Sequence, residues 1–132
     1  LYRADNFNLL NAYISLSEYY QSKNHKQKSL HTSALGALTG FTKILSVVSN
    51  RNPEFKYTNL GALFEEASLY PDIIEWGINN SVWMGFYQFA EQAQKNDYPI
   101  FAKQMYNVLK DYSPEEYWQD AANTRLQELN IN

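Results

Sequence analysis

The chain has 132 residues, of which 45% are hydrophobic and 19% are charged, with no cysteine and a formal net charge of −3. This length suffices for a hydrophobic core without cross-links, so we expect a single domain over residues 1–132. The composition lies outside the disordered range, and the lack of cysteine excludes a disulfide framework and thiolate zinc sites.

Charge is divided unevenly along the sequence. Residues 1–57 carry seven Lys/Arg against three Asp/Glu, a net +4, whereas residues 58–132 carry four against eleven, a net −7. We favour the simple interpretation, solvated faces of unequal sign. The same asymmetry would also suit orientation on a charged partner or head-to-tail homo-oligomerisation, and the sequence leaves both open.

Apolar residues at helical spacing predict two long helices in the first half. The first begins with a cap at Asp5 or Asn6 and ends near Ser22. The second runs from Ser29 to about Val48 and carries one stripe of larger apolar residues and one of small residues. The larger residues are Leu30, Ala34, Leu38, Phe41, Leu45 and Val48, and the small ones are Ser33, Gly36, Ala37 and Gly40. Small residues let helices approach closely, so we expect the second helix to be buried at the centre.

This second helix also raises the question of a membrane span, since Lys43 is the only charged residue between Leu30 and Asn50. Its threonines, serines and two glycines make it too polar for an isolated span. We therefore predict no membrane span and a soluble protein, cytoplasmic rather than secreted. Because the chain begins with Leu1 rather than Met, the sequence leaves open the possibility of a removed signal peptide.

Prolines and cap residues divide the second half into shorter helices. Caps at Thr58, Asp72 and Ser81 precede three of them, and Ser113 with Glu116 fits a capping box in front of the last. The expected helices cover residues 59–70, 73–78, 82–95, 99–110 and, finally, about 114–129. No strand-like alternation is present. The sequence therefore predicts an all-α fold of six or seven short helices packed as antiparallel helical hairpins, in a compact bundle or a short solenoid-like array.

The stretch from Trp83 to Pro114 resembles a tetratricopeptide hairpin in its order of aromatic residue, small residue, turn and later proline. Gly85 follows Trp83 too closely for that family's pattern, Tyr106 stands where a small residue is expected, and Pro114 arrives late. We ascribe the similarity to the general packing of helical hairpins and assign the chain to no family.

No arrangement of residues predicts catalysis, a cofactor or a metal site. His25 and His31 lack metal-ligand spacing to each other or to a Glu, and adjacent carboxylates such as Glu65 and Glu66 splay around a helix instead of sharing a proton. Cysteine nucleophiles and glycine-rich phosphate loops are also missing. We therefore expect no enzyme, no cofactor and no metal. The basic cluster at 23–28 has no basic helical stripe beside it, so we expect no nucleic-acid partner either.

Aromatic residues make up 16% of the chain, and many of them are neighbours in sequence. Adjacent helical residues point about 100° apart, so one ring of each pair tends to be less buried than the other. Partly exposed Tyr and Trp side chains are typical of binding interfaces. We expect most rings in the core, and the four predicted to contact a partner are Tyr20, Trp76, Tyr87 and Trp118.

Together these features predict a non-catalytic helical protein–protein interaction module that binds a partner protein or peptide through an aromatic-rich face. The alternative is a small acidic inhibitor of the immunity-protein kind, which neutralises a cognate toxin or enzyme by tight binding. A clustered acidic face in residues 58–132 would favour that alternative. A third hypothesis is an enzyme or small-ligand receptor with a ring-lined cavity in which His31 meets a carboxylate.

Overall fold

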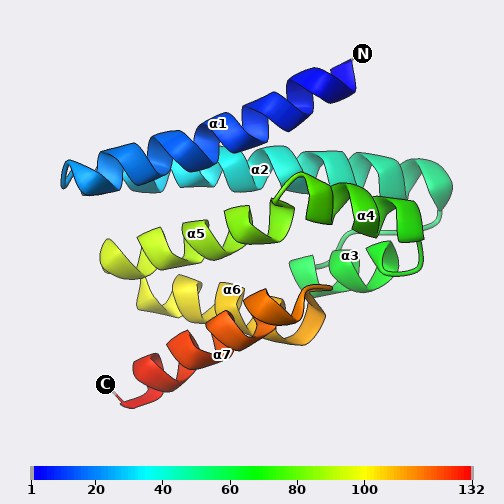
Figure 1. Cartoon of the computed structure of the whole chain (residues 1–132). Coiled ribbons are helices and arrows are strands. Elements are labelled where there is room, and N and C mark those ends of the chain that lie inside the picture. Colours follow the sequence, from blue (N-terminus) through cyan, green and yellow to red (C-terminus); the bar gives the residue numbers. More distant parts are fainter. Residues whose placement is uncertain (1, 132) are drawn as a thin grey trace.

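A computed structural model describes the backbone of residues 2–131 and the side chains of residues 9–130. Within these limits the chain forms seven α-helices and no strand, so the all-α prediction is confirmed (Figure 1). Successive long helices pack as antiparallel pairs in a compact bundle. The helices are α1 (Tyr2–Ser22), α2 (Lys26–Arg51), α3 (Leu60–Ala67), α4 (Pro71–Asn79), α5 (Val82–Lys95), α6 (Pro99–Tyr112) and α7 (Glu116–Ile131).

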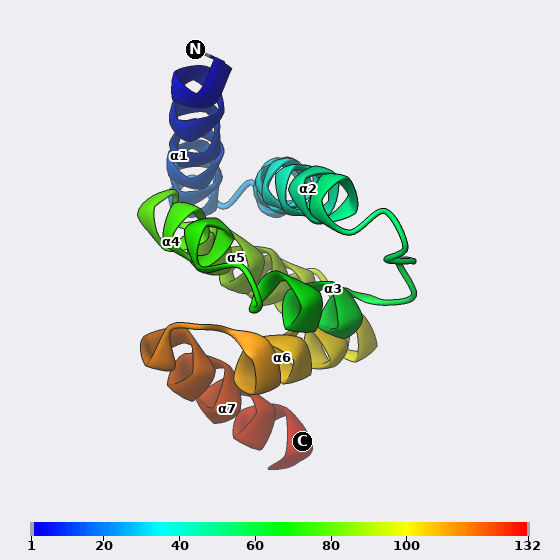
Figure 2. The same ribbon diagram turned by 90° about the vertical axis from the view of Figure 1, so that its right-hand side faces the viewer.

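Helix α5 lies at the centre of the bundle and contacts α1, α2, α4, α6 and α7. Figure 1 shows α1, α5 and α7 running in one direction and α2 and α6 in the other. Viewed end-on, α5 stands between the α1–α2 hairpin and the α6–α7 hairpin (Figure 2). The short α3 contacts both α2 and α6, and α4 contacts α2 and α5. Two different sides of α5 are therefore flanked by helix pairs, one by α2 and α6 and one by α1 and α7.

Helix α2 buries its small residues, whereas most of its larger stripe is only partly buried and Val48 alone of that stripe is fully buried. A Cβ on Gly36 would lie 3.2 Å from Tyr13 Cβ, and one on Gly40 would lie 3.1 Å from Val82 Cγ1. The predicted close approach of neighbouring helices is therefore confirmed. The larger stripe is the less buried of the two, however, since Leu38 at its middle is 55% exposed. The expectation of a central, buried helix holds for one side of α2 only.

None of the helices in the described chain, α2 included, combines the length and hydropathy that a membrane-spanning segment needs.

Large rings fill the core at the start of α5. Trp83 stacks on Phe64 of α3 with ring centroids 5.3 Å apart, and Phe86 lies edge-on to both. The hydroxyl of the buried Tyr106 donates to Gln94 Oε1 at 2.9 Å, and burial raises the pKa of this phenol. The buried apolar cluster continues from α1 to α7, so it joins the two long hairpins.

Several helices begin at other residues than expected. Helix α2 begins at Lys26 rather than Ser29, and α4 begins at Pro71, so Asp72 lies in its first turn instead of capping it. Helix α1 begins at Tyr2, so Asp5 and Asn6 lie inside it, and their side chains are outside the described part of the chain. Asn59 rather than Thr58 caps α3, since Asn59 Oδ1 accepts a hydrogen bond from the Ala62 amide at 2.8 Å.

The capping box expected at Ser113 is also incomplete. The Glu115 amide donates to Ser113 Oγ at 3.2 Å, and α7 begins at Glu116 itself. The Ser113 amide, which a capping box would pair with the Glu116 side chain, donates to the Leu109 carbonyl at 3.0 Å and closes α6. These differences move helix ends without changing the order of the helices.

Candidate functional site

An apolar groove of about 670 Å³ opens to solvent between α2 and α6. Phe86 and Phe89 of α5 lie at its floor, and α3 closes one end through Leu60. Its polar lining residues are Tyr57, Asn59 and Gln104, and no charged side chain is among the lining. The remaining lining residues are Ala34, Ala37, Leu38, Phe41, Phe101, Met105 and Val108.

The groove continues into a second hollow of about 420 Å³ at its other end. The two hollows share Ala34, Phe89 and Phe101, and the second adds Leu30, His31, Ala93 and Tyr98. We call this continuous surface the α2–α6 groove. Between Leu30 and Phe41 it follows α2 for about 16 Å at 1.5 Å per residue, or roughly three helical turns.

Exposed apolar side chains line the rim of the α2–α6 groove as well as its interior. Tyr98 is 57% exposed and Tyr57 is 45% exposed, in addition to Leu38. The ring of Tyr57 packs edge-on against Phe41 at 5.4 Å, and the rings of Phe89 and Phe101 lie 5.1 Å apart. The rings are thus held in place by one another while part of each remains open to solvent.

The groove follows from the packing of α2 on its neighbours. Its small stripe faces α1 and α5, so its larger stripe, centred on Ala34 and Leu38, turns toward the gap beside α6. Across the gap, α6 presents Phe101, Met105 and Val108 at three- and four-residue spacing. The wedge of α3 against both α2 and α6 covers one end of the gap and leaves the rest open.

A separate pocket, also of about 420 Å³, lies on the other side of α5, and we call it the α1–α7 pocket. At about 100° per residue, Met84, Tyr87, Gln88 and Glu91 face roughly opposite to Phe86 and Phe89 on this helix. Helix α1 contributes Glu18, Gln21 and Ser22, and α7 contributes Tyr117 and Trp118. This pocket is polar and aromatic, in contrast to the α2–α6 groove.

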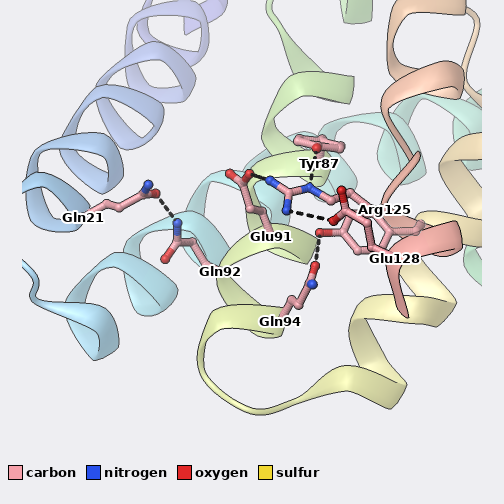
Figure 3. A network of polar contacts seen from close by, with 8 residues as sticks. Gln21, Tyr87, Glu91, Gln92, Gln94, Arg125 and Glu128 are labelled. Carbon is pink, nitrogen blue, oxygen red and sulfur yellow. Dashed lines mark hydrogen bonds and ion pairs between the residues drawn. The ribbon is translucent and has the colours of Figure 1, made fainter. Parts of the chain in front are cut away.

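A polar network joins α5 to α7 beside the α1–α7 pocket (Figure 3). Arg125 Nε donates to the Tyr87 hydroxyl at 2.9 Å, and the same guanidinium forms ion pairs with Glu91 and, at 3.5 Å, with Glu128. Burial alone would lower the pKa of Arg125, but the hydrogen bond to Tyr87 and the charge of Glu91 outweigh it and raise that pKa. Arg125 is therefore a fixed cation that holds the Tyr87 ring and Glu91 in place.

The four side chains predicted to contact a partner do not share one face. Tyr87 and Trp118 come together in the α1–α7 pocket, with ring centroids 5.2 Å apart. Tyr20 stacks on His25 at 6.1 Å near the α1–α2 turn. Trp76 lines a separate hollow of about 260 Å³ between α2 and α4. None of the four is among the residues lining the α2–α6 groove.

The residues that form the groove, such as Phe41, Phe89 and Phe101, were expected in the core. The sequence signal that could have distinguished these groove residues from core residues is the pair of stripes on α2. A helix that packs closely through small residues cannot bury its larger stripe against the same neighbours. The structure does not show the pairing of His31 with a carboxylate, since no Asp or Glu of the described residues lines the groove.

No group of three or more His, Asp or Glu side chains suited to a metal ion occurs among the residues that the structure describes. No protein-family model, curated protein or solved structure matches this chain.

Proposed function

We propose that the chain is a non-catalytic helical interaction module and that the α2–α6 groove binds an amphipathic helix of a partner protein. The observation that carries the proposal is the groove itself, an uncharged, aromatic-lined channel about three turns long between two helices. A helix presenting apolar residues at positions i, i+4 and i+7 has the length and spacing to fill such a channel.

The open shape of the groove favours a partner helix over a small apolar ligand. A small-molecule site typically buries 70–90% of its ligand, which requires walls on most sides. Here Leu38, Tyr57 and Tyr98 expose apolar surface at the rim, where a small ligand would not cover it. A helix lying along the groove would cover both floor and rim, and contiguous exposed apolar surface of this kind marks protein-binding sites.

The distribution of carboxylates argues against the acidic inhibitor. The eleven Asp and Glu residues of the second half belong to five helices and two connections. Several already have partners within the chain: Asp72 pairs with Arg51, and Glu66 accepts hydrogen bonds from Tyr70 and Asn52. An inhibitor that blocks a basic active site needs clustered, unpaired carboxylates, so we favour the interaction module.

A peptide-display selection against the wild-type chain tests the proposal. We expect the selected peptides to share apolar residues at helical spacing and to gain helical circular dichroism when bound. Leu38→Glu places a carboxylate in a groove without a counter-charge, so peptide affinity should fall at least about tenfold. The matched control is Leu69→Glu, because Leu69 is 67% exposed and lines none of the hollows described here.

Equal affinity of the peptides for wild type and Leu38→Glu would refute the groove as the binding site. Selection of peptides without helical spacing would refute the helical partner.

A further inference from the structure

The α1–α7 pocket carries an excess of negative charge. Its lining includes the carboxylates of Glu18 and Glu91 and no Lys or Arg. Arg125 pairs with Glu91 of the lining and with Glu128, which does not line the pocket. Glu18 forms no ion pair within residues 9–130, so it is the unpaired negative charge of the lining.

Three rings provide walls against which a cation would be stabilised. Tyr117 and Trp118 stand perpendicular, with centroids 4.6 Å apart and an interplanar angle of 87°, and the Tyr87 ring is tilted by 39° against Trp118. A cation over the face of a Trp or Tyr ring is attracted by the ring quadrupole. Tyr117 is 71% exposed, so most of its ring is available to a ligand.

A buried amide lies at the back of the pocket. Gln88 is 8% exposed, and its Nε2 donates to the Ile14 carbonyl at 3.1 Å, which fixes the amide and leaves Oε1 as its acceptor. The Oε1 of Gln21 is already used, since it accepts from Gln92 Nε2 at 2.5 Å. A fixed acceptor beside aromatic rings, here Gln88 Oε1, suits a ligand that carries N–H donors.

From the rings, the carboxylates and the buried amide together we infer that the α1–α7 pocket binds an organic cation, an alkylammonium or guanidinium group such as the end of a lysine or arginine side chain. Arg125 provides an internal precedent, because Tyr87 and Glu91 already hold its guanidinium from one edge. The inference does not rest on the proposed function, since the pocket and the α2–α6 groove lie on opposite faces of α5.

The test is a titration of the ¹⁵N-labelled chain followed by the indole N–H resonance of Trp118, which is assigned by its loss in Trp118→Phe. The probes are acetyl-Gly-X-Gly-amide peptides in which X is lysine, trimethyllysine, arginine or acetyllysine. Free tetramethylammonium and guanidinium ions are titrated beside them. We expect saturable shifts with the cationic peptides and none with the acetyllysine peptide, which has as many non-hydrogen atoms as the trimethyllysine peptide but is uncharged.

Two exposed residues test the walls without disturbing the core. Tyr117→Ala and Glu18→Gln should each weaken binding of the lysine peptide about threefold to fivefold. The matched controls are Tyr98→Ala, which removes an exposed ring from the opposite face, and Glu54→Gln, which removes an exposed carboxylate outside the pocket. Both controls should leave the affinity unchanged.

Equal shifts with lysine and acetyllysine peptides would overturn the inference, as would an unchanged affinity in Tyr117→Ala. If the cationic peptides bind more tightly than the free ions, the ligand is a cationic side chain of another protein. If both bind equally, the ligand is a free organic cation. Leu38→Glu should bind the lysine peptide like the wild type. The experiment therefore distinguishes a failure of the proposed helix binding in the groove from a failure of the proposed cation binding in this pocket.

Discussion

Replacing two buried helical glycines with alanine should change stability in opposite directions. A Cβ on Gly77 would lie 2.7 and 2.8 Å from Cζ3 and Cη2 of Trp83, closer than real Cβ contacts allow. Trp83 is fully buried and stacked on Phe64, so its ring cannot move away without disturbing the core. A Cβ on Gly85 would meet nothing within 4 Å.

The expected magnitudes follow from helix propensity and overpacking. Alanine is better than glycine by about 0.8–1 kcal/mol in a helix interior, and Gly85→Ala should gain most of this. An overpacked core costs about 1–3 kcal/mol. Gly77 lies near the end of α4, where the propensity gain is smaller, so Gly77→Ala should lose about 1–2 kcal/mol of unfolding free energy.

Urea unfolding monitored by circular dichroism measures both changes. The midpoint should rise for Gly85→Ala and fall for Gly77→Ala, with the slope m unchanged, because neither substitution alters the surface exposed on unfolding. A Gly77→Ala variant as stable as the wild type would refute the reasoning, since it would show that the Trp83 ring does not lie rigidly against α4.

Two further changes test individual contacts. Ser17 and Ser29 are buried and each donates to the other's carbonyl, so Ser17→Ala and Ser29→Ala should each cost about 1 kcal/mol. In urea unfolding the double variant should lose less than the sum, and full additivity would show that the two hydroxyls act independently. Burial raises the pKa of Glu115, so ionisation of this carboxyl destabilises the fold as pH rises through its ordinary range. Glu115→Gln should therefore be more stable than wild type at pH 7 and equal to it below the ordinary carboxyl pKa, and a gain that persists at low pH would contradict this.

The order and type of the helices could be predicted from the sequence because local signals determine them. The helix expected over 82–95 is α5 (Val82–Lys95), and Pro99 begins α6 as its fixed φ angle predicts. Cap geometry was less predictable, since the choice between Thr58 and Asn59 depends on the path of the preceding loop. The periodicity of apolar residues thus determines the fold class, and tertiary contacts determine the ends.

The candidate sites were harder to predict because they form between distant segments. Tyr87 and Trp118 were predicted to contact a partner, but it is the packing of α7 on α5 that brings their rings together. Neighbouring aromatic residues in the sequence also led us to predict partner contacts for Tyr20 and Trp76, although these two lie in other parts of the fold. The periodicity of apolar residues predicts which residues share one face of a helix. It does not predict which face of a neighbouring helix packs against that face.

The division of α5 into two faces explains how one small bundle presents two different surfaces. Phe86 and Phe89 provide an apolar floor for the α2–α6 groove, and Tyr87 and Glu91 provide a polar wall for the α1–α7 pocket. An apolar helix in the groove and a cationic side chain in the pocket would therefore approach α5 from opposite directions and would not collide. Because both surfaces depend on the same backbone, a change that rotates α5 should weaken both kinds of binding. A side-chain substitution on one face should weaken only one, and the Leu38→Glu and Tyr117→Ala variants measured with both ligands separate these two cases.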